Sequence, residues 1–119
     1  MKRHKIPETA VEELGEKLKT QERFVILDVR ESVEIDKVSL EDERVCFAPM
    51  SRLAYSGIEA LPEPARSKSA EIVVLCHHGV RSTEVTGWLL AQGWQKVSSL
   101  RGGIDAYALL VDPSLGRYY

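Results

Sequence analysis

The residues best suited to chemistry lie in one stretch of seven, Cys-His-His-Gly-Val-Arg-Ser, which begins at Cys76. A thiolate is a strong nucleophile, and positive charges or a helix amino terminus beside it favour its formation. Arg81 supplies a fixed positive charge, and His77 and His78 can supply partial ones. Gly79 permits the positive φ that a loop curling around an anion usually needs. These residue types predict a reactive Cys76 in an anion-binding loop; the competing interpretation is a buried, inert cysteine at the end of a strand.

The sequence on either side of this stretch predicts the elements that position it. Residues 72–75 are a continuous apolar run rich in β-branched residues, which is typical of a strand buried on both faces. From Ser82 onward, apolar residues recur at the i, i+3, i+4 spacing of a helix with one buried face, and Gly93 is suited to end that helix. Cys76 would then lie between the carboxyl end of a strand and the amino end of a helix, where open α/β sheets bind their ligands.

The rest of the chain indicates that strands and helices alternate. Strands are expected at residues 4–6, 24–27, 45–47 and 96–100, and helices at residues 9–18, 52–61 and 104–110. Thr9 and Glu12 fit a capping box at the start of the first helix. Residues 61–69, which contain two prolines, fit an exposed connection. This alternation predicts a mainly parallel sheet covered by helices.

Length and composition limit the classes of protein that fit. With 119 residues, 44% of them hydrophobic, the chain suits one globular domain, residues 1–119, with a modest core. The net charge of −2, with acidic and basic residues interspersed, argues against a nucleic-acid or membrane partner, and no stretch is long enough to span a membrane. The basic start at Met1 lacks the apolar run of a signal peptide, and two cysteines without such a signal favour a cytoplasmic location over a disulfide framework.

Three motifs resemble those of rhodanese-like sulfurtransferases and occur in that family's order. Residues 76–82 resemble the active-site loop Cys-x-x-Gly-x-Arg-Ser, residues 27–31 contain the Asp-Val-Arg-Glu signature, and residues 100–107 contain the Gly-Gly-Ile-x-Ala-aromatic segment after the last strand. Residues 111–118 resemble the end of rhodanese domains fused to ubiquitin-like-protein activating enzymes and of free-standing bacterial relatives. The resemblance implies an α/β fold of three layers, with a mainly parallel five-stranded sheet flanked by helices on both faces.

The resemblance also implies an activity. In the family's chemistry, the Cys76 thiolate would attack the outer sulfur of a small anionic donor such as thiosulfate and hold that sulfur as a persulfide. A thiophilic acceptor then takes the sulfur: cyanide in vitro, or a thiol or a protein in the cell. No cofactor and no metal is implied.

The candidate site residues come from the three motifs. Besides the nucleophile Cys76, the expected substrate-binding residues are His77, His78, Gly79, Val80 and Arg81, and the expected supporting residues are Asp28, Arg30, Ser82, Arg101 and Gly102. Asp28 is either a cap for a helix at residues 31–36 or a partner of the loop amides or of Arg81, and the resemblance favours the second role. His77 and His78 either line the pocket mouth or simply face solvent.

Other kinds of site remain in competition with sulfur transfer. A non-catalytic interaction module is the main alternative function, although inactive relatives usually lose the cysteine that this chain keeps. A cysteine phosphatase is disfavoured, because its loop has one more residue between cysteine and arginine than the four between Cys76 and Arg81. A metal site is rejected, since the adjacent side chains of Cys76, His77 and His78 seldom converge on one ion.

One segment, residues 36–53, departs from the family pattern and leaves the rim of the pocket open to question. Within it, Cys46 could release a persulfide by forming a disulfide with Cys76. The simpler interpretation, which we favour, is that Cys46 is a small residue filling a strand position.

Overall fold

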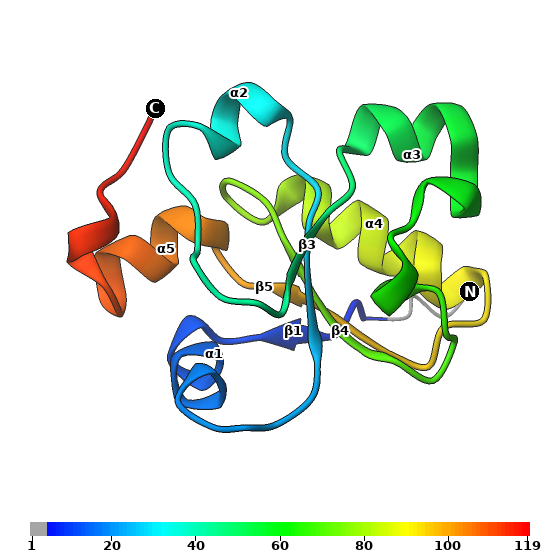
Figure 1. Ribbon diagram of the computed structural model, residues 1–119, viewed down its shortest axis with the longest axis horizontal. Coiled ribbons are helices and arrows are strands. Elements are labelled where there is room, and N and C mark those ends of the chain that lie inside the picture. Colours follow the sequence, from blue (N-terminus) through cyan, green and yellow to red (C-terminus); the bar gives the residue numbers. More distant parts are fainter. Residues whose placement is uncertain (1–4) are drawn as a thin grey trace.

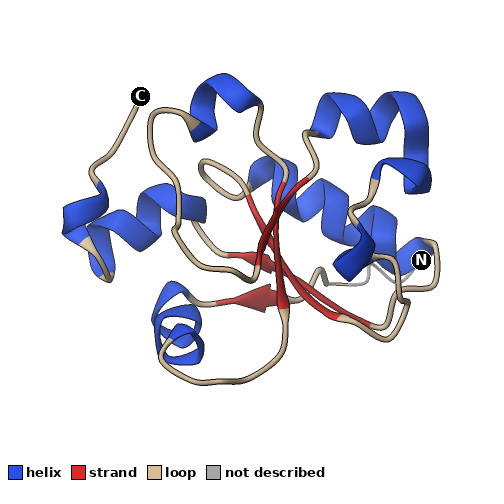
Figure 2. Ribbon diagram, in the orientation of Figure 1, coloured by secondary structure: helices blue, strands red, loops and turns tan. Residues whose placement is uncertain are grey.

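The computed structural model describes residues 5–119 and contains a five-stranded sheet of parallel strands in the order β1-β5-β4-β2-β3. The strands are β1 (Glu8–Thr9), β2 (Val25–Asp28), β3 (Val45–Phe47), β4 (Glu71–Leu75) and β5 (Lys96–Leu100). The α-helices are α1 (Val11–Leu18), α2 (Ser32–Ile35), α3 (Met50–Ser56), α4 (Val80–Ala91) and α5 (Gly103–Leu110). Helices lie on both sides of the sheet (Figure 1, Figure 2), which confirms the predicted three-layer α/β fold.

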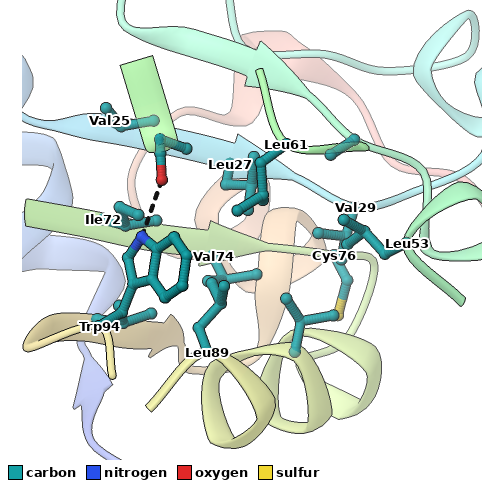
Figure 3. Packing of buried hydrophobic residues seen from close by; sticks show 14 residues of the cluster. Val25, Leu27, Val29, Leu53, Leu61, Ile72, Val74, Cys76, Leu89 and Trp94 are labelled. Atoms are coloured by element: carbon teal, nitrogen blue, oxygen red, sulfur yellow. Dashed lines mark hydrogen bonds between the residues drawn. The ribbon is translucent and has the colours of Figure 1, made fainter. Parts of the chain in front are cut away.

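One face of the sheet packs against α3 and α4. Leu27 of β2 points to this face and belongs to one buried cluster with Leu53 of α3 and Leu89 of α4. At the far end of the cluster, Trp94 donates a hydrogen bond of 2.9 Å from Nε1 to the carbonyl oxygen of Ala65 (Figure 3). This bond satisfies the one polar atom of a large buried side chain, so the indole can fill the layer without a desolvation penalty.

The opposite face packs against α1 and α5. Ile26, the neighbour of Leu27, points to this face and clusters with Leu14 of α1 and Ile104 of α5. Burial on both faces explains why the strands read as continuous apolar runs. Gly15 allows α1 to approach the end of α5 closely, because a Cβ atom there would lie 2.9 Å from Cγ1 of Val111. Close packing against Val111 thus explains a glycine in the interior of α1.

The central elements agree with the sequence prediction. Strands β3 and β5 have the predicted bounds, β4 begins one residue earlier than predicted, and β2 is shifted by one residue from the predicted 24–27. Helix α4 begins at Val80, two residues before Ser82, and α5 begins at Gly103 instead of residue 104. Among the described residues, no helix combines the length and the apolar character that crossing a membrane requires.

The start of the chain differs from the prediction. The edge strand is Glu8–Thr9, not residues 4–6, and residue 4 lies outside the described residues. The capping box is also wrong: Ala10 is the N-cap residue of α1, and the Thr9 hydroxyl instead lies 2.6 Å from Oγ of Ser98. Thr9 belongs to β1, and its hydroxyl bonds to a side chain of β5 and forms no cap for α1.

The segment after β3 also differs from the prediction. The helix expected at residues 52–61 is divided into α3 and a 3-10 turn, Gly57–Ala60, because the chain changes direction at Gly57, whose φ is +64°. The connection at residues 61–69 contains a second 3-10 turn, Glu63–Ala65, and is not wholly exposed. Leu61 and Ala65 are buried in the cluster beneath α3 and α4.

Candidate active site

Cys76 follows the last residue of β4, and its sulfur faces the amino end of α4. The backbone N–H groups of Gly79 and Ser82 donate to Sγ at 3.1 and 3.3 Å, and the thiol lies 3.3 Å from Oγ of Ser82. Cys76 is only 1% exposed and lies at the end of the apolar cluster, beside Val29 and Leu53 (Figure 3). Two N–H donors and a helix amino terminus directed at one sulfur form a cradle that stabilises negative charge there.

The cradle depends on glycines at two places. Gly79 is the N-cap residue of α4 and has a φ of +101°, a conformation that side-chain-bearing residues rarely adopt. Gly103 begins α5 and touches the loop from below, where a Cβ atom would overlap the carbonyl oxygens of Cys76 and His77. Those carbonyls accept hydrogen bonds from the next two amides of α5, at 2.9 and 3.1 Å. The first turn of α5 therefore supports the backbone of the loop through two hydrogen bonds. The close contact leaves no room for a side chain at Gly103, which explains a glycine at this position of the third motif.

Ser82 belongs to a short chain of buried hydroxyl groups. Its Oγ lies 2.7 Å from Oγ of Ser99 on β5, and Ser99 lies 3.3 Å from Oγ1 of Thr83. Both serines are at most 1% exposed. These hydrogen-bonded hydroxyl groups orient the Ser82 hydroxyl toward Cys76. The sequence prediction missed Ser99; its only signal is an inward position on a strand next to β4.

Arg81 pairs with Glu34 and not with Asp28, which corrects the predicted partner. Its Nη1 and Nη2 donate to the two carboxylate oxygens of Glu34 at 2.7 and 2.8 Å. These bonds lower the pKa of Glu34 from 4.5 to about 2 and raise the pKa of Arg81. Glu34 is held near the loop because α2 starts with a capping box. In this box the side chains of Glu31 and Glu34 each accept a hydrogen bond from the other residue's backbone N–H. Nothing in the sequence spacing marked Glu34 as this partner.

Asp28 is paired with Arg30, two residues later in the same motif. The Asp28 carboxylate accepts from Nε and Nη2 of Arg30, the latter at 2.7 Å, and from the Arg30 backbone N–H. Arg30 is fully buried and also donates to the carbonyl oxygen of Val38 at 2.8 Å. Burial opposes the charged form, but the bonds to Asp28 outweigh it and leave the pKa of Arg30 raised. Asp28 neither caps a helix nor contacts Arg81; the pair holds the loop after β2.

Comparison with known proteins identifies this architecture. A sequence model of the rhodanese-like domain matches residues 10–110. The chain belongs to the rhodanese-like family. It is 31% identical to a sulfurtransferase of Allochromatium vinosum over 82% of this chain and 83% of that protein. It is 34% identical to the chloroplastic rhodanese-like/PpiC domain-containing protein 12 of Arabidopsis thaliana, but spans 38% of that protein's length. A crystal structure of a rhodanese-like domain protein from Staphylococcus aureus superposes with a TM-score of 0.72 at 23% identity, covering 96% of this chain and all of that one.

The two histidines of the rhodanese-like loop point away from the sulfur cradle. The His77 ring stacks on Tyr118 with ring centroids 3.8 Å apart, and its Nε2–H donates to the carbonyl oxygen of Tyr118 at 2.8 Å. Burial lowers the pKa of His77, which disfavours the positive charge expected of this ring. His78 is exposed, with Nδ1 3.9 Å from the Asp105 carboxylate. Val80, also expected to bind substrate, is 69% exposed.

Of the two supporting residues expected from the third motif, only Gly102 lies against the loop. A Cβ atom on Gly79 would be 3.2 Å from the amide nitrogen of Gly102, so the two backbones are packed closely. Arg101 is exposed and pairs with Glu8 at 3.2 Å, on the far side of β5 from the cradle. The structure therefore does not bring the Arg101 side chain to the site.

Cys46 lies in a different environment from Cys76. It is opposite Leu27 on β3 and packs against the same apolar cluster, and burial raises the pKa of its thiol. β2 lies between β3 and β4, so the two cysteines are separated by two strand spacings, roughly 9–10 Å, before any offset along the strands. A direct disulfide needs Cα atoms within about 7 Å and would require the sheet to open. Residues 5–119 contain no group of three or more His, Cys, Asp or Glu side chains placed to hold a metal ion.

Proposed function

We propose that this protein is a sulfurtransferase that carries a sulfane sulfur as a persulfide on Cys76. The observation that carries the proposal is the pair of backbone N–H groups, from Gly79 and Ser82, that donate to the Cys76 sulfur at 3.1 and 3.3 Å. Donors fixed in this way stabilise negative charge without reorganisation. The charge that these donors stabilise is the thiolate charge on which the first attack depends; after transfer the negative charge lies mainly on the outer sulfur, about 2 Å away.

The reaction has two displacement steps at sulfur. In the first, the Cys76 thiolate attacks the outer sulfur of thiosulfate; the donor's S–S bond breaks, and sulfite leaves with the bonding electron pair. In the second, cyanide or a thiolate attacks the outer sulfur of the persulfide. Thiocyanate or a new persulfide is released, and the Cys76 thiolate returns. Because Cys76 is 1% exposed, the donor reaches it only when groups around the loop move aside.

The length of the loop favours sulfur over phosphorus. Four residues separate Cys76 from Arg81, and the bidentate bond to Glu34 directs the Arg81 guanidinium outward to α2. A phosphatase needs room and donors around a whole phosphoryl group in line with its leaving group. Hydrolysis of an aryl phosphate should therefore be no faster than with Cys76→Ser.

Intact-mass measurement after incubation with thiosulfate tests the proposal. The parent protein should gain the mass of one sulfur atom and lose it on addition of cyanide, with thiocyanate formed. Cys76→Ser should show neither change. Cys46→Ser is the matched control and should behave like the parent, because Cys46 lacks the N–H cradle. A parent protein that gains no sulfur, or a Cys46→Ser variant as inactive as Cys76→Ser, would refute the proposed mechanism.

A further inference from the structure

We propose that Tyr118 is a positioning residue of the catalytic loop. It contacts the loop near one end directly and near the other through Glu34, although Tyr118 itself lies outside the region matched by the family model. The matched region ends at residue 110, whereas the tail segment, residues 116–119, returns to the carboxyl edge of the sheet. The expected effect of Tyr118 on the rate of sulfur loading rests on the proposed function. Its expected effect on the Cys76 sulfur does not, and is measured by alkylation of Cys76.

The first hold is on the residue that follows Cys76. The Tyr118 ring is stacked on His77 at an interplanar angle of 8°, and the Tyr118 carbonyl accepts from Nε2 of His77. A carbonyl oxygen can only accept, so this bond fixes a proton on Nε2 of His77 and orients the ring. The His77 carbonyl is meanwhile bound by the Asp105 amide, so backbone and side chain of the residue are both fixed.

The second hold is on the residue that precedes Ser82. The Tyr118 hydroxyl donates to Oε1 of Glu34 at 3.1 Å, and Glu34 holds Arg81. The same hydroxyl accepts from Nη1 of Arg30 at 3.2 Å. One phenol therefore joins the buried Arg30 pair to the Glu34–Arg81 pair.

The tail segment has its own anchor. Arg117 forms two hydrogen bonds, of 2.9 and 3.0 Å, to the carboxylate of Asp105 in the first turn of α5. That turn also supports the backbone of the catalytic loop through the amides of Ile104 and Asp105. Tyr118 is thus placed by the element that already holds the loop from beneath.

The consequence concerns the two N–H groups that point at sulfur. They belong to Gly79, which lies between His77 and Arg81, and to Ser82, which directly follows Arg81. If Tyr118 is removed, His77 and the Glu34–Arg81 pair gain freedom, and the N–H groups align less well with the sulfur. A less aligned cradle stabilises the thiolate less, so thiolate formation shifts to higher pH and sulfur loading slows.

The test measures iodoacetamide alkylation of Cys76 against pH, and sulfur loading from thiosulfate, in Tyr118→Ala, Tyr118→Phe and Tyr119→Ala. Tyr119 is 94% exposed, so its variant controls for loss of an aromatic ring from the tail segment. Cys46 in the same protein is an internal reference for alkylation. Tyr118→Ala should move the alkylation midpoint of Cys76 to higher pH and slow loading about tenfold.

Tyr118→Phe keeps the stack and the carbonyl acceptor and loses only the hydroxyl, so its midpoint and loading rate should lie between those of the parent and of Tyr118→Ala. Tyr119→Ala and the Cys46 midpoint should match the parent. An unchanged Cys76 midpoint in Tyr118→Ala would overturn the inference, even if the variant unfolds at a lower temperature, because that is the result expected from a purely structural contact. If the parent itself takes no sulfur from thiosulfate, the proposed function fails, and the alkylation series still decides the role of Tyr118.

Discussion

Two arginine–carboxylate pairs lie at the carboxyl edge of the sheet. They differ in how deeply they are buried and in how far apart their partners are in the sequence. Arg30 is fully buried and pairs with Asp28, two residues away. Arg81 keeps 31% of its side chain exposed and pairs with Glu34, 47 residues away. Breaking a buried pair leaves an uncompensated charge, whereas water partly screens the other pair. The inner pair therefore bears chiefly on stability, and the outer pair on the relative position of α2 and the Cys76 loop.

The largest effect is expected from breaking the inner pair. Arg30→Met leaves the Asp28 carboxylate buried without its partner and should lower the free energy of unfolding by roughly 3–5 kcal/mol, measured by urea denaturation. Adding Asp28→Asn to this variant removes the orphaned charge and should recover part of the loss. A loss below about 1 kcal/mol for Arg30→Met, as for an exposed pair, would erase the distinction between the two pairs.

A smaller effect is expected at the outer pair. Arg81→Gln removes two charge-assisted hydrogen bonds from a half-exposed site and should lower the free energy of unfolding by about 1–3 kcal/mol. It should also slow sulfur loading, because Arg81 adjoins Ser82 of the cradle. If Arg81→Gln destabilised the fold as much as Arg30→Met while loading stayed at the parent rate, the division of roles would be reversed.

The partner assignment can be checked by double-mutant cycles. Glu34→Gln combined with Arg81→Gln should show a coupling energy of at least about 0.5 kcal/mol, as for residues in direct contact. Asp28→Asn combined with Arg81→Gln should show much less, since the two side chains share no hydrogen bond. The opposite ranking would restore Asp28 as the partner of Arg81.

The outer pair should also give a pH signature. Arg81 lowers the folded-state pKa of Glu34 from 4.5 to about 2, so this group stabilises the fold fully above the unfolded value and loses that contribution as pH falls toward about 2. The difference in unfolding free energy between the parent and Glu34→Gln should be constant near neutral pH and shrink below about pH 4.5. A difference that grows on acidification would contradict a depressed pKa.

The smallest effect is expected at Arg101, which belongs to neither pair. Its exposed contact with Glu8 should contribute little, so Arg101→Gln should change the unfolding free energy by less than about 0.5 kcal/mol and leave sulfur loading unchanged. A clear loss of loading would return Arg101 to the supporting residues that the family resemblance implied.

The sequence by itself predicted the central elements of the sheet and the edge at which Cys76 and Asp28 lie. Continuous apolar runs predicted β2 and β4, helical spacing predicted α4, and the alternation predicted a parallel sheet, because burial on both faces constrains every residue of a central strand. Parallel strands end at one edge, so the motifs at Cys76 and Asp28 had to meet there. Gly79 could be assigned to the curl of the loop because its conformation is a local property.

Only the tertiary structure decided which side chains meet at that edge. The carboxylates of Asp28 and Glu34 both lie at this edge. Asp28 is already bonded to Arg30, and α2 places the Glu34 carboxylate within hydrogen-bond distance of Arg81. The contact of Tyr118 with Arg30 joins residues 88 positions apart and follows from the return path of the tail segment after α5. Periodicity is local and was readable from the sequence. Side-chain partners across the sheet edge depend on backbone paths and rotamer reach that sequence spacing does not encode.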